Sequence, residues 1–309
     1  MKVVFHYSAG PRLAARLAAL PGLEVVVCPE EDEAGFAAAM RDADVLWHVL
    51  KRCSAAVIAG APRLKLIQKI GVGVNTIDLP AAAARGIAVC NLPGTNAPAV
   101  AEMTLLLMLA VLRRLPRFDA ELRAGQWVCA PADQDGLAEL GGRTVGLVGY
   151  GAIPQRLAPV LRALGCRVVF TSQTRRDDPD WCTLPNLLAQ ADIVSLHIPQ
   201  TEATTGLLDA AAFGQMKPGA VLINTARGGL VDEAALLAAL RSGRLAGAGL
   251  DVFAVEPATA GHPLLALPNV VVAPHVAWLT AGTFDRSLTI AAENCARLAA
   301  GQDLLHRVQ

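Results

Sequence analysis

The sequence predicts an α/β protein with two doubly wound parallel-sheet domains, one of them inserted into the other. Short apolar segments alternate with helical patterns along nearly all 309 residues, which is typical of parallel sheets covered by helices. A glycine-rich strand–turn–helix unit begins only near residue 145, so a different α/β half precedes it. A helical pattern at about 280–300 is long enough to return to that first half.

The first half of the chain contains a series of strand candidates. A turn-rich segment at 92–98 then marks the first domain boundary, and a long helix is expected from Ala99 to about Leu115, where Pro116 follows. The expected strands lie at 3–6, 24–28, 45–49, 66–70 and 88–91, with a helix at 11–20.

The second half continues the same alternation. The expected strands lie at 145–148, 166–170, 193–197, 220–224, 247–252 and 270–273, with a helix at 155–164. We therefore expect one domain made of residues 1–97 plus 279–309, and a second domain made of residues 98–278.

Composition excludes several classes of function. Hydrophobic residues make up 53% of the chain, charged residues 17%, and the formal net charge is zero, so nucleic acid is not an expected partner. The seven cysteines form no CxxC pair, which favours reduced thiols in a cytoplasm and predicts no metal site. The N-terminus indicates a strand and not a signal peptide. The most apolar stretch, 99–112, is interrupted by Glu102 and is too short to span a membrane.

The segment 145–154 has the features of a dinucleotide-binding turn. An apolar strand runs into Gly149 and Gly151, and a helical pattern follows. In a Rossmann-like unit, glycines here allow a tight turn and a close approach of the backbone to a pyrophosphate at the helix N-terminus. Pro154 replaces the third glycine of the usual pattern. A proline suits a first helical position, but the helix–strand contact must then be made differently.

Three charged residues follow apolar strands: Arg227, Glu256 and His275. Ligands of α/β proteins bind beyond the carboxyl ends of the strands, so these side chains are expected to face a ligand. An arginine fork can hold a carboxylate at two points, and a histidine beside a carboxylate is a proton donor near neutral pH. The alternatives are a surface Arg227 paired with Asp232 or Glu233, a solvated Glu256, and a structural or helix-capping His275.

Seven sequence blocks follow one another along nearly the whole chain. Together they indicate a protein family more specifically than any single block does. The blocks are GVGVNTID (71–78), NLPGTNAPAVAE (91–102), GLVGYGAIP (146–154), VSLHIPQTEATTGLL (194–208), INTARGGLVDEAAL (223–236), GLDVFAVEP (249–257) and NVVVAPHVA (269–277). In this order they resemble the D-isomer-specific 2-hydroxyacid dehydrogenase family. The resemblance implies an NAD(P)-dependent oxidoreductase that acts on small 2-keto or 2-hydroxy acids, with a nucleotide domain inserted into a substrate domain.

The resemblance also implies catalytic roles. Arg227 would bind the carboxylate and carbonyl of the substrate, and His275 would be the acid/base that protonates the carbonyl oxygen as hydride arrives. Glu256 would hold His275 protonated and oriented. The backbone of Val72 and Gly73, in the first domain, would also bind the substrate carboxylate.

A larger set of residues is implied for the cofactor. Asp251 would bind the nicotinamide amide, although the residue pattern alone is equally typical of a strand-end aspartate that caps a turn. The other implied cofactor residues are Thr104, Gly149, Gly151, Ala152, Ile153, Pro154, Ser172, Gln173, Arg175, Arg176, His197, Pro199, Thr204, Thr225, Ala226, Arg227 and His275.

The sequence departs from the family after the second strand of the nucleotide unit. The family usually has an aspartate there that binds a ribose 2′-hydroxyl, but this chain has Ser172, followed by Arg175 and Arg176. Without the carboxylate a 2′-phosphate is not repelled, and an arginine can pair with it. We therefore expect NADP(H) to be favoured over NAD(H). The alternative is that these arginines belong to a solvated loop.

The segment 275–278 resembles the hydroxypyruvate/glyoxylate reductase branch, in which an Ala-Trp pair follows the catalytic histidine. Glyoxylate or hydroxypyruvate is therefore the favoured substrate. Trp278 is expected either to wall a small substrate pocket or to pack at the domain junction.

The family also implies a homodimer built on the helix near 99–115. The chain stops at Gln309 without a C-terminal regulatory domain, which weighs against the large phosphoglycerate dehydrogenases. Two alternatives stay open: a nucleotide-gated, corepressor-like binding protein, and a formate or phosphite dehydrogenase-type enzyme.

Overall fold

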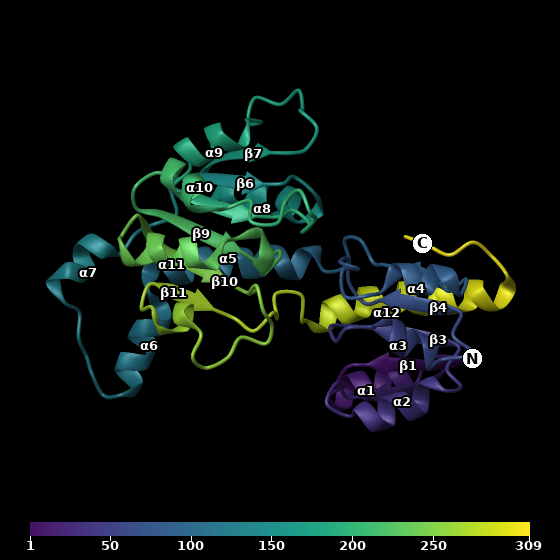
Figure 1. The fold of residues 1–309 in the computed structure, drawn as a ribbon. Helices are drawn as coiled ribbons and strands as arrows, with labels where there is room; N and C mark the ends of the chain where they lie inside the picture. The colour runs from purple at the N-terminus through teal and green to yellow at the C-terminus, as the bar shows by residue number, and fades with distance from the viewer. The chain divides into compact units, whose positions relative to one another are not determined.

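The chain folds into two units, and each unit contains one parallel β-sheet. The computed structural model describes residues 1–309. One unit comprises Met1–Asn96 and Thr280–Gln309, and the other comprises Ala97–Leu279. The first unit contains a five-stranded sheet and the second a six-stranded sheet, each accompanied by helices (Figure 1). The predicted α/β class with two parallel-sheet domains is confirmed.

The five-stranded sheet has the order β2-β1-β3-β4-β5, and all its strands are parallel. The last helix of the chain contacts this sheet, because Asn294 Nδ2 donates to Gln68 Oε1 at 2.7 Å and both side chains are buried. The strands are β1 (Lys2–His6), β2 (Glu24–Cys28), β3 (Val45–His48), β4 (Leu66–Lys69) and β5 (Ala88–Cys90). The helices are α1 (Pro11–Ala18), α2 (Glu33–Met40), α3 (Ala55–Ala59), α4 (Leu79–Ala84) and α12 (Ala281–Ala300).

The six-stranded sheet has the order β11-β10-β9-β8-β6-β7, again with parallel strands. Its strands are β6 (Thr144–Val148), β7 (Arg167–Thr171), β8 (Ile193–Leu196), β9 (Ala220–Asn224), β10 (Leu245–Leu250) and β11 (Val270–Val272). Its helices are α5 (Ala97–Arg113), α6 (Leu115–Arg123), α7 (Pro131–Gly136), α8 (Ala152–Ala163), α9 (Leu184–Gln190), α10 (Ala210–Gln215) and α11 (Glu233–Arg241), with 3₁₀ turns at Gly228–Leu230 and Pro263–Ala266.

Two apolar clusters form the core of this second unit. Helices α5 and α8 contribute to one cluster, and α9, α10 and α11 contribute to the other. Helix α5 can approach β10 closely because two glycines leave room. A Cβ on Gly247 would lie 2.8 Å from Cγ1 of Val111, and a Cβ on Gly249 would lie 2.9 Å from Cβ of Leu107. Both distances are too short for packed carbon atoms.

Two helix boundaries differ from the sequence prediction. Helix α5 begins at Ala97, inside the segment expected to be a turn, and the left-handed backbone of Arg114 (φ 49°) separates it from α6. Helix α8 begins at Ala152, so Pro154 occupies the third helical position and not the first. The missing N–H is tolerated there too, because the first N–H groups of a helix have no partner within it.

None of the helices combines the length and the apolar character that a membrane-spanning segment requires. No group of three or more His, Cys, Asp or Glu side chains is arranged to hold a metal ion. All seven cysteines are free thiols.

Candidate active site

Three neighbouring strands of the six-stranded sheet end at the loops that carry Arg227, Glu256 and His275. Strands β9, β10 and β11 lie side by side, and each of these loops follows the carboxyl end of one strand. The backbone N–H of Asp251, just past β10, donates to the carbonyl of Asn224 at the end of β9 at 2.9 Å. The sheet therefore brings the loops of the three predicted residues together at the carboxyl ends of its strands.

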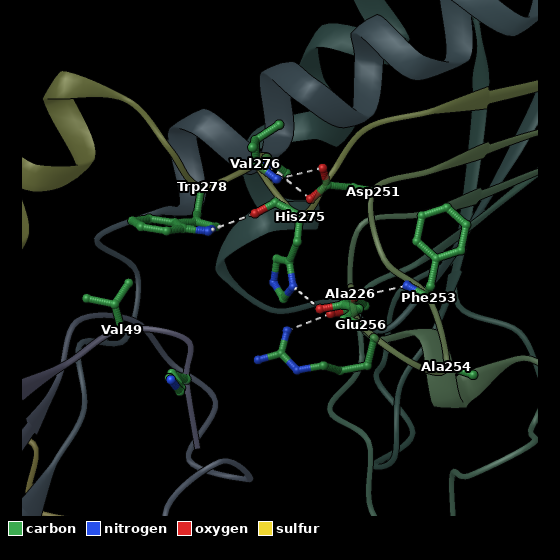
Figure 2. A network of polar contacts seen from close by, with 12 residues as sticks. Val49, Ala226, Asp251, Phe253, Ala254, Glu256, His275, Val276 and Trp278 are labelled. Atoms are coloured by element: carbon green, nitrogen blue, oxygen red, sulfur yellow. Dashed lines mark hydrogen bonds and ion pairs between the residues drawn. The ribbon is translucent and has the colours of Figure 1, made fainter. Parts of the chain in front are cut away.

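His275 and Glu256 form a short contact. Nδ1 of His275 lies 2.6 Å from Oε2 of Glu256, as Figure 2 shows. The other carboxylate oxygen of Glu256 accepts the backbone N–H of Phe253 at 3.0 Å. Burial acts to raise the pKa of Glu256, but the hydrogen bonds from His275 and Phe253, with the charges of His275 and Arg227, outweigh it and lower the pKa. The carboxylate therefore stays ionised and fixes Nδ1, which leaves Nε2 for proton transfer.

The turn at 275–278 holds His275 in a left-handed backbone conformation. Its φ is 55°, which costs about 1–2 kcal/mol for a residue other than glycine. The His275 N–H donates to the carbonyl of Asp251 at 2.8 Å, and the carboxylate of Asp251 accepts the N–H groups of Val276 and Ala277, both at 2.9 Å. The indole N–H of Trp278 donates to the carbonyl of His275 at 3.0 Å (Figure 2).

Asp251 thus caps this turn, as the pattern of a strand-end aspartate indicated. Its side chain is 1% exposed, and burial raises its pKa although the two backbone N–H groups act in the opposite direction. Both carboxylate oxygens are used by the protein itself, so Asp251 has a structural role before any ligand is considered.

The loop that carries Arg227 is shaped by Asn224. The Asn224 side chain donates to the carbonyl of Arg227 at 2.8 Å and accepts the N–H of Ala226 at 3.0 Å. The next residue, Gly228, allows no side chain, because a Cβ there would lie 1.9 Å from the carbonyl carbon of Phe253. The Arg227 loop therefore packs backbone against backbone on the loop that leads to Glu256.

Arg227 is not paired with either of the acids considered as surface partners. Asp232 caps α11 by accepting the N–H groups of its first turn, and Glu233 pairs with His262 at 3.2 Å. Nη1 of Arg227 instead donates to the carbonyl of Ala226 at 2.6 Å. Burial lowers the pKa of Arg227, and the charge of Glu256 opposes that effect. The charge of Glu256, one member of the histidine–carboxylate pair, therefore acts on Arg227.

The glycine-rich turn joins β6 to α8. Gly149 has φ 99°, and a Cβ there would lie 2.6 Å from the carbonyl oxygen of His197, so this position requires glycine. Gly151 is the N-cap of α8, no side chain caps the helix there, and no atom lies within 4 Å of where its Cβ would be. The packing of the protein does not require glycine at 151. Ala152, Ile153 and Pro154 form the first turn of α8.

The loop after β7 is exposed. Ser172 Oγ donates to the carbonyl of Thr174 at 2.7 Å, and Gln173 is exposed. Arg176 lies 5.5 Å from the ring centroid of Tyr150, in the glycine-rich turn, and Arg175 lies 5.6 Å from that of Trp181. The two guanidinium groups are therefore supported by aromatic faces at the end of β7.

The other implied cofactor residues mostly bond to the protein itself. The buried Thr104 on α5 lies 3.0 Å, oxygen to oxygen, from Thr225, which follows β9 and precedes Ala226. His197 Nε2 lies 2.9 Å from Ser195 Oγ, and burial lowers the pKa of His197 to about 3, so its ring is neutral. In the same loop Thr204 Oγ1 donates to the carbonyl of Pro199 at 2.8 Å.

Val72 and Gly73 belong to the other unit. They lie in the loop after β4, where Gly71 has φ 154° and Asn91 Nδ2 donates to the carbonyl of Val72 at 3.0 Å. The side chain of Val72 is exposed.

Sequence reasoning missed two groups that shape the site. Asn224 organises the Arg227 loop, and the indole N–H of Trp278 holds the His275 carbonyl. A polar residue at the end of a strand that is otherwise apolar was the available signal for Asn224. The sequence carried no signal for the indole bond, which depends on the left-handed turn.

Comparison with known proteins identifies the family. Residues 105–277 match the family described as "D-isomer specific 2-hydroxyacid dehydrogenase, NAD binding domain". The chain is 38% identical over 273 residues to a glyoxylate reductase from Aeropyrum pernix, covering 85% of this chain and 82% of that protein. A crystal structure of a protein from Thermus thermophilus is 40% identical, has a TM-score of 0.90 and is covered completely, as is this chain.

A D-3-phosphoglycerate dehydrogenase from Mycobacterium tuberculosis is 41% identical over 281 residues, which is 89% of this chain and 52% of that protein. The chain spans about half the length of the curated phosphoglycerate dehydrogenases that it matches.

Proposed function

The chain belongs to the D-isomer specific 2-hydroxyacid dehydrogenase family, and we propose that it reduces a small 2-keto acid with a nicotinamide cofactor, with glyoxylate or hydroxypyruvate as substrate. The observation that carries this proposal is the His275–Glu256 contact of 2.6 Å, at the same sheet edge as the Arg227 loop. The name of the Aeropyrum pernix relative supports glyoxylate. The bound cofactor supplies the hydride.

His275 acts as the acid. Its Nε2 gives a proton to the carbonyl oxygen of the substrate, while Glu256 on Nδ1 stabilises the charged ring and fixes its direction. Arg227 binds the substrate carboxylate and the carbonyl oxygen, where negative charge develops during reduction. In the reverse direction a neutral His275 takes the proton of the hydroxyl group.

The family resemblance assigns further substrate contacts to Val72 and Gly73. Val72 and Gly73 offer backbone N–H groups to the carboxylate, and Trp278 lies beside His275 on the other unit. Residues 1–97 plus 279–309 then form the substrate domain, and residues 98–278 the nucleotide domain.

The glycine-rich turn fits the pyrophosphate of a dinucleotide. Gly151 has space for a close approach, and the first turn of α8 has no side-chain cap, so its N–H groups can serve an anion. Gly149 to Pro154 would hold the pyrophosphate. The residues that complete the proposed cofactor site are Thr104, His197, Pro199, Thr204, Thr225, Ala226, Arg227, Asp251 and His275.

We also propose that NADP(H) is preferred over NAD(H). Ser172 stands where a carboxylate would repel a 2′-phosphate, and Gln173 adds no charge. Arg175 and Arg176 are exposed at the same strand end and available for pairing.

A homodimer through α5 completes the proposal. Helix α5 is apolar along most of its length, yet Leu106 and Leu109 are 53% and 38% exposed. Burial of such side chains against a second copy is favourable.

The test is an initial-rate panel of glyoxylate, hydroxypyruvate, pyruvate and phenylpyruvate, each with NADH and NADPH. We expect reduction of glyoxylate or hydroxypyruvate in the wild type and its loss in His275→Gln. Formate and phosphite oxidation are assayed with the same protein. No keto-acid reduction, with binding of the dinucleotide retained, would favour a nucleotide-gated binding protein.

A further inference from the structure

The bond between Trp278 and the His275 carbonyl is not explained by either role expected of this tryptophan. Walling a substrate pocket or packing at a junction requires only the ring. The indole N–H, however, donates to the carbonyl oxygen of His275 at 3.0 Å, three residues back in the chain. The side chain of Trp278 thus binds the backbone of the proposed proton donor.

His275 needs such restraint because its backbone is left-handed. A residue other than glycine keeps φ near 55° only when its surroundings impose it. Three of the four restraints come from Asp251, which binds the N–H groups of His275, Val276 and Ala277. The carbonyl of His275 is held by Trp278, as Figure 2 shows.

The direction of the imidazole follows from this backbone. The carbonyl carbon of His275 is bonded to its Cα, so a fixed carbonyl limits displacement of Cα and Cβ, and a contact of 2.6 Å between Nδ1 and Glu256 tolerates little displacement. Glu256, the other partner of this contact, lies on a separate loop. The hydrogen bonds of the 275–278 turn do not fix that loop. The indole bond therefore acts on the geometry of the histidine–carboxylate pair.

We propose that Trp278 is a positioning residue: its indole N–H fixes the His275 carbonyl and thereby keeps Nδ1 of His275 on Glu256. This inference rests on the proposed function of His275 as the acid. Any contact of the ring with substrate is secondary to this role.

Two substitutions separate the possible roles. Trp278→Phe keeps an aromatic ring and removes the N–H, and Trp278→Leu removes both. Trp127→Phe is the control for the exchange itself, because Trp127 is 90% exposed. We expect Trp278→Phe to lower kcat about five- to tenfold for every keto acid in the panel, the size of one lost hydrogen bond, with cofactor Kd unchanged.

The acid limb of the pH profile should also move. The hydrogen bond from His275 helps to lower the pKa of Glu256. If Trp278→Phe loosens this pair, Glu256 takes up its proton at a higher pH than in the wild type, and activity is lost at that higher pH. Full kcat and an unmoved acid limb in Trp278→Phe would overturn the proposal. A pocket wall would instead leave Trp278→Phe active, and Trp278→Leu would gain relative rate on phenylpyruvate. A packing role would show only as lower thermal stability.

A measurement without turnover separates this inference from the proposed function. The Nδ1 proton of His275, bonded to Glu256, is followed by proton NMR and assigned by its loss in His275→Gln. We expect the signal to shift or to exchange faster in Trp278→Phe and to stay unchanged in Trp127→Phe. An unchanged signal in Trp278→Phe overturns the positioning role, whereas an inactive wild type overturns only the proposed function.

Discussion

The loops after β11 and β7 follow the carboxyl ends of the two edge strands of one parallel sheet, but the protein holds them very differently. Residues 275–278 are fixed by four hydrogen bonds from Asp251 and Trp278, and Asp251 is buried. Residues 173–176 are exposed, and the guanidinium groups of Arg175 and Arg176 lie over aromatic faces, with one long hydrogen bond of 3.4 Å from Arg176 to the carbonyl of Tyr150.

The difference matches what each loop is proposed to do. Proton transfer needs a donor placed within hydrogen-bond reach of one atom. Attraction between a cation and a phosphate falls off only gradually with distance, so accurate placement matters less. Substitutions in or beside the β11 turn should therefore have large effects, and substitutions in the β7 loop should have small ones.

The largest effect is expected for Arg227→Ala. Removal of a donor aimed at a developing negative charge costs about 10²–10³-fold in kcat. Keto-acid reduction should fall by that factor while the dissociation constant of the cofactor stays near the wild-type value. The control is Arg241→Ala, at an exposed position on α11. Near-normal kcat/KM with glyoxylate and hydroxypyruvate would remove Arg227 from the site.

Glu256→Gln should lower kcat about 10- to 100-fold, in the range of acid–base contributions. The pKa of Glu256 is lowered in the folded protein. Ionised Glu256 therefore stabilises the pair fully above the ordinary glutamate pKa. This stabilisation is lost as the pH falls through the lowered pKa of Glu256. Wild-type reduction should decline only in acid below that ordinary range, and this acid limb should vanish in the variant. The limb should persist in Glu293→Gln, which breaks a surface pair with Arg297.

Asp251→Asn tests the restraint of the turn through stability. One of the two backbone N–H groups loses its acceptor, and a buried unsatisfied group costs about 1–3 kcal/mol. The free energy of unfolding, measured with urea, should fall by that amount. Asp209→Asn at the N-cap of α10 is the matched control, because asparagine caps a helix about equally well. Equal stability of the two variants would mean that the turn tolerates the loss.

The smallest effect belongs to the β7 loop. Exposed pairs contribute about 0–1 kcal/mol each, so the double substitution of Arg175→Ala and Arg176→Ala should weaken NADPH binding by about tenfold at most. NADH binding should not change. Arg156→Ala on α8 serves as the control, since Arg156 is exposed outside this loop. Tighter binding of NADH by the wild type would show that the arginines are only solvated surface.

Alternating apolar strands and helices were enough to predict the two parallel sheets, because both faces of a parallel strand are buried. The strand-end positions of Arg227, Glu256 and His275 followed from the same pattern. The left-handed turn at His275 could not be predicted, because it depends on Asp251 from the neighbouring strand. The break at Arg114 was hidden for a similar reason, since its backbone angle carries no sequence signature.

The glycines of β10 show the same limit. A glycine inside a strand usually indicates a bulge or a close approach, but the sequence does not say of what. Only the packed structure shows that Gly247 and Gly249 allow α5 to pack closely against β10.

The chain order of the two units has a consequence for biosynthesis. The sheet of the first unit needs the end of the chain, because Asn294 binds Gln68 in its interior and the backbone N–H of Val89 donates to Gln309. Residues 1–96 leave the ribosome first but cannot complete their core until residues 280–309 follow. The inserted unit has all its strands by residue 272 and can fold earlier. The nascent first sheet must therefore avoid aggregation while about 180 further residues are made, roughly 10–40 s at typical elongation rates.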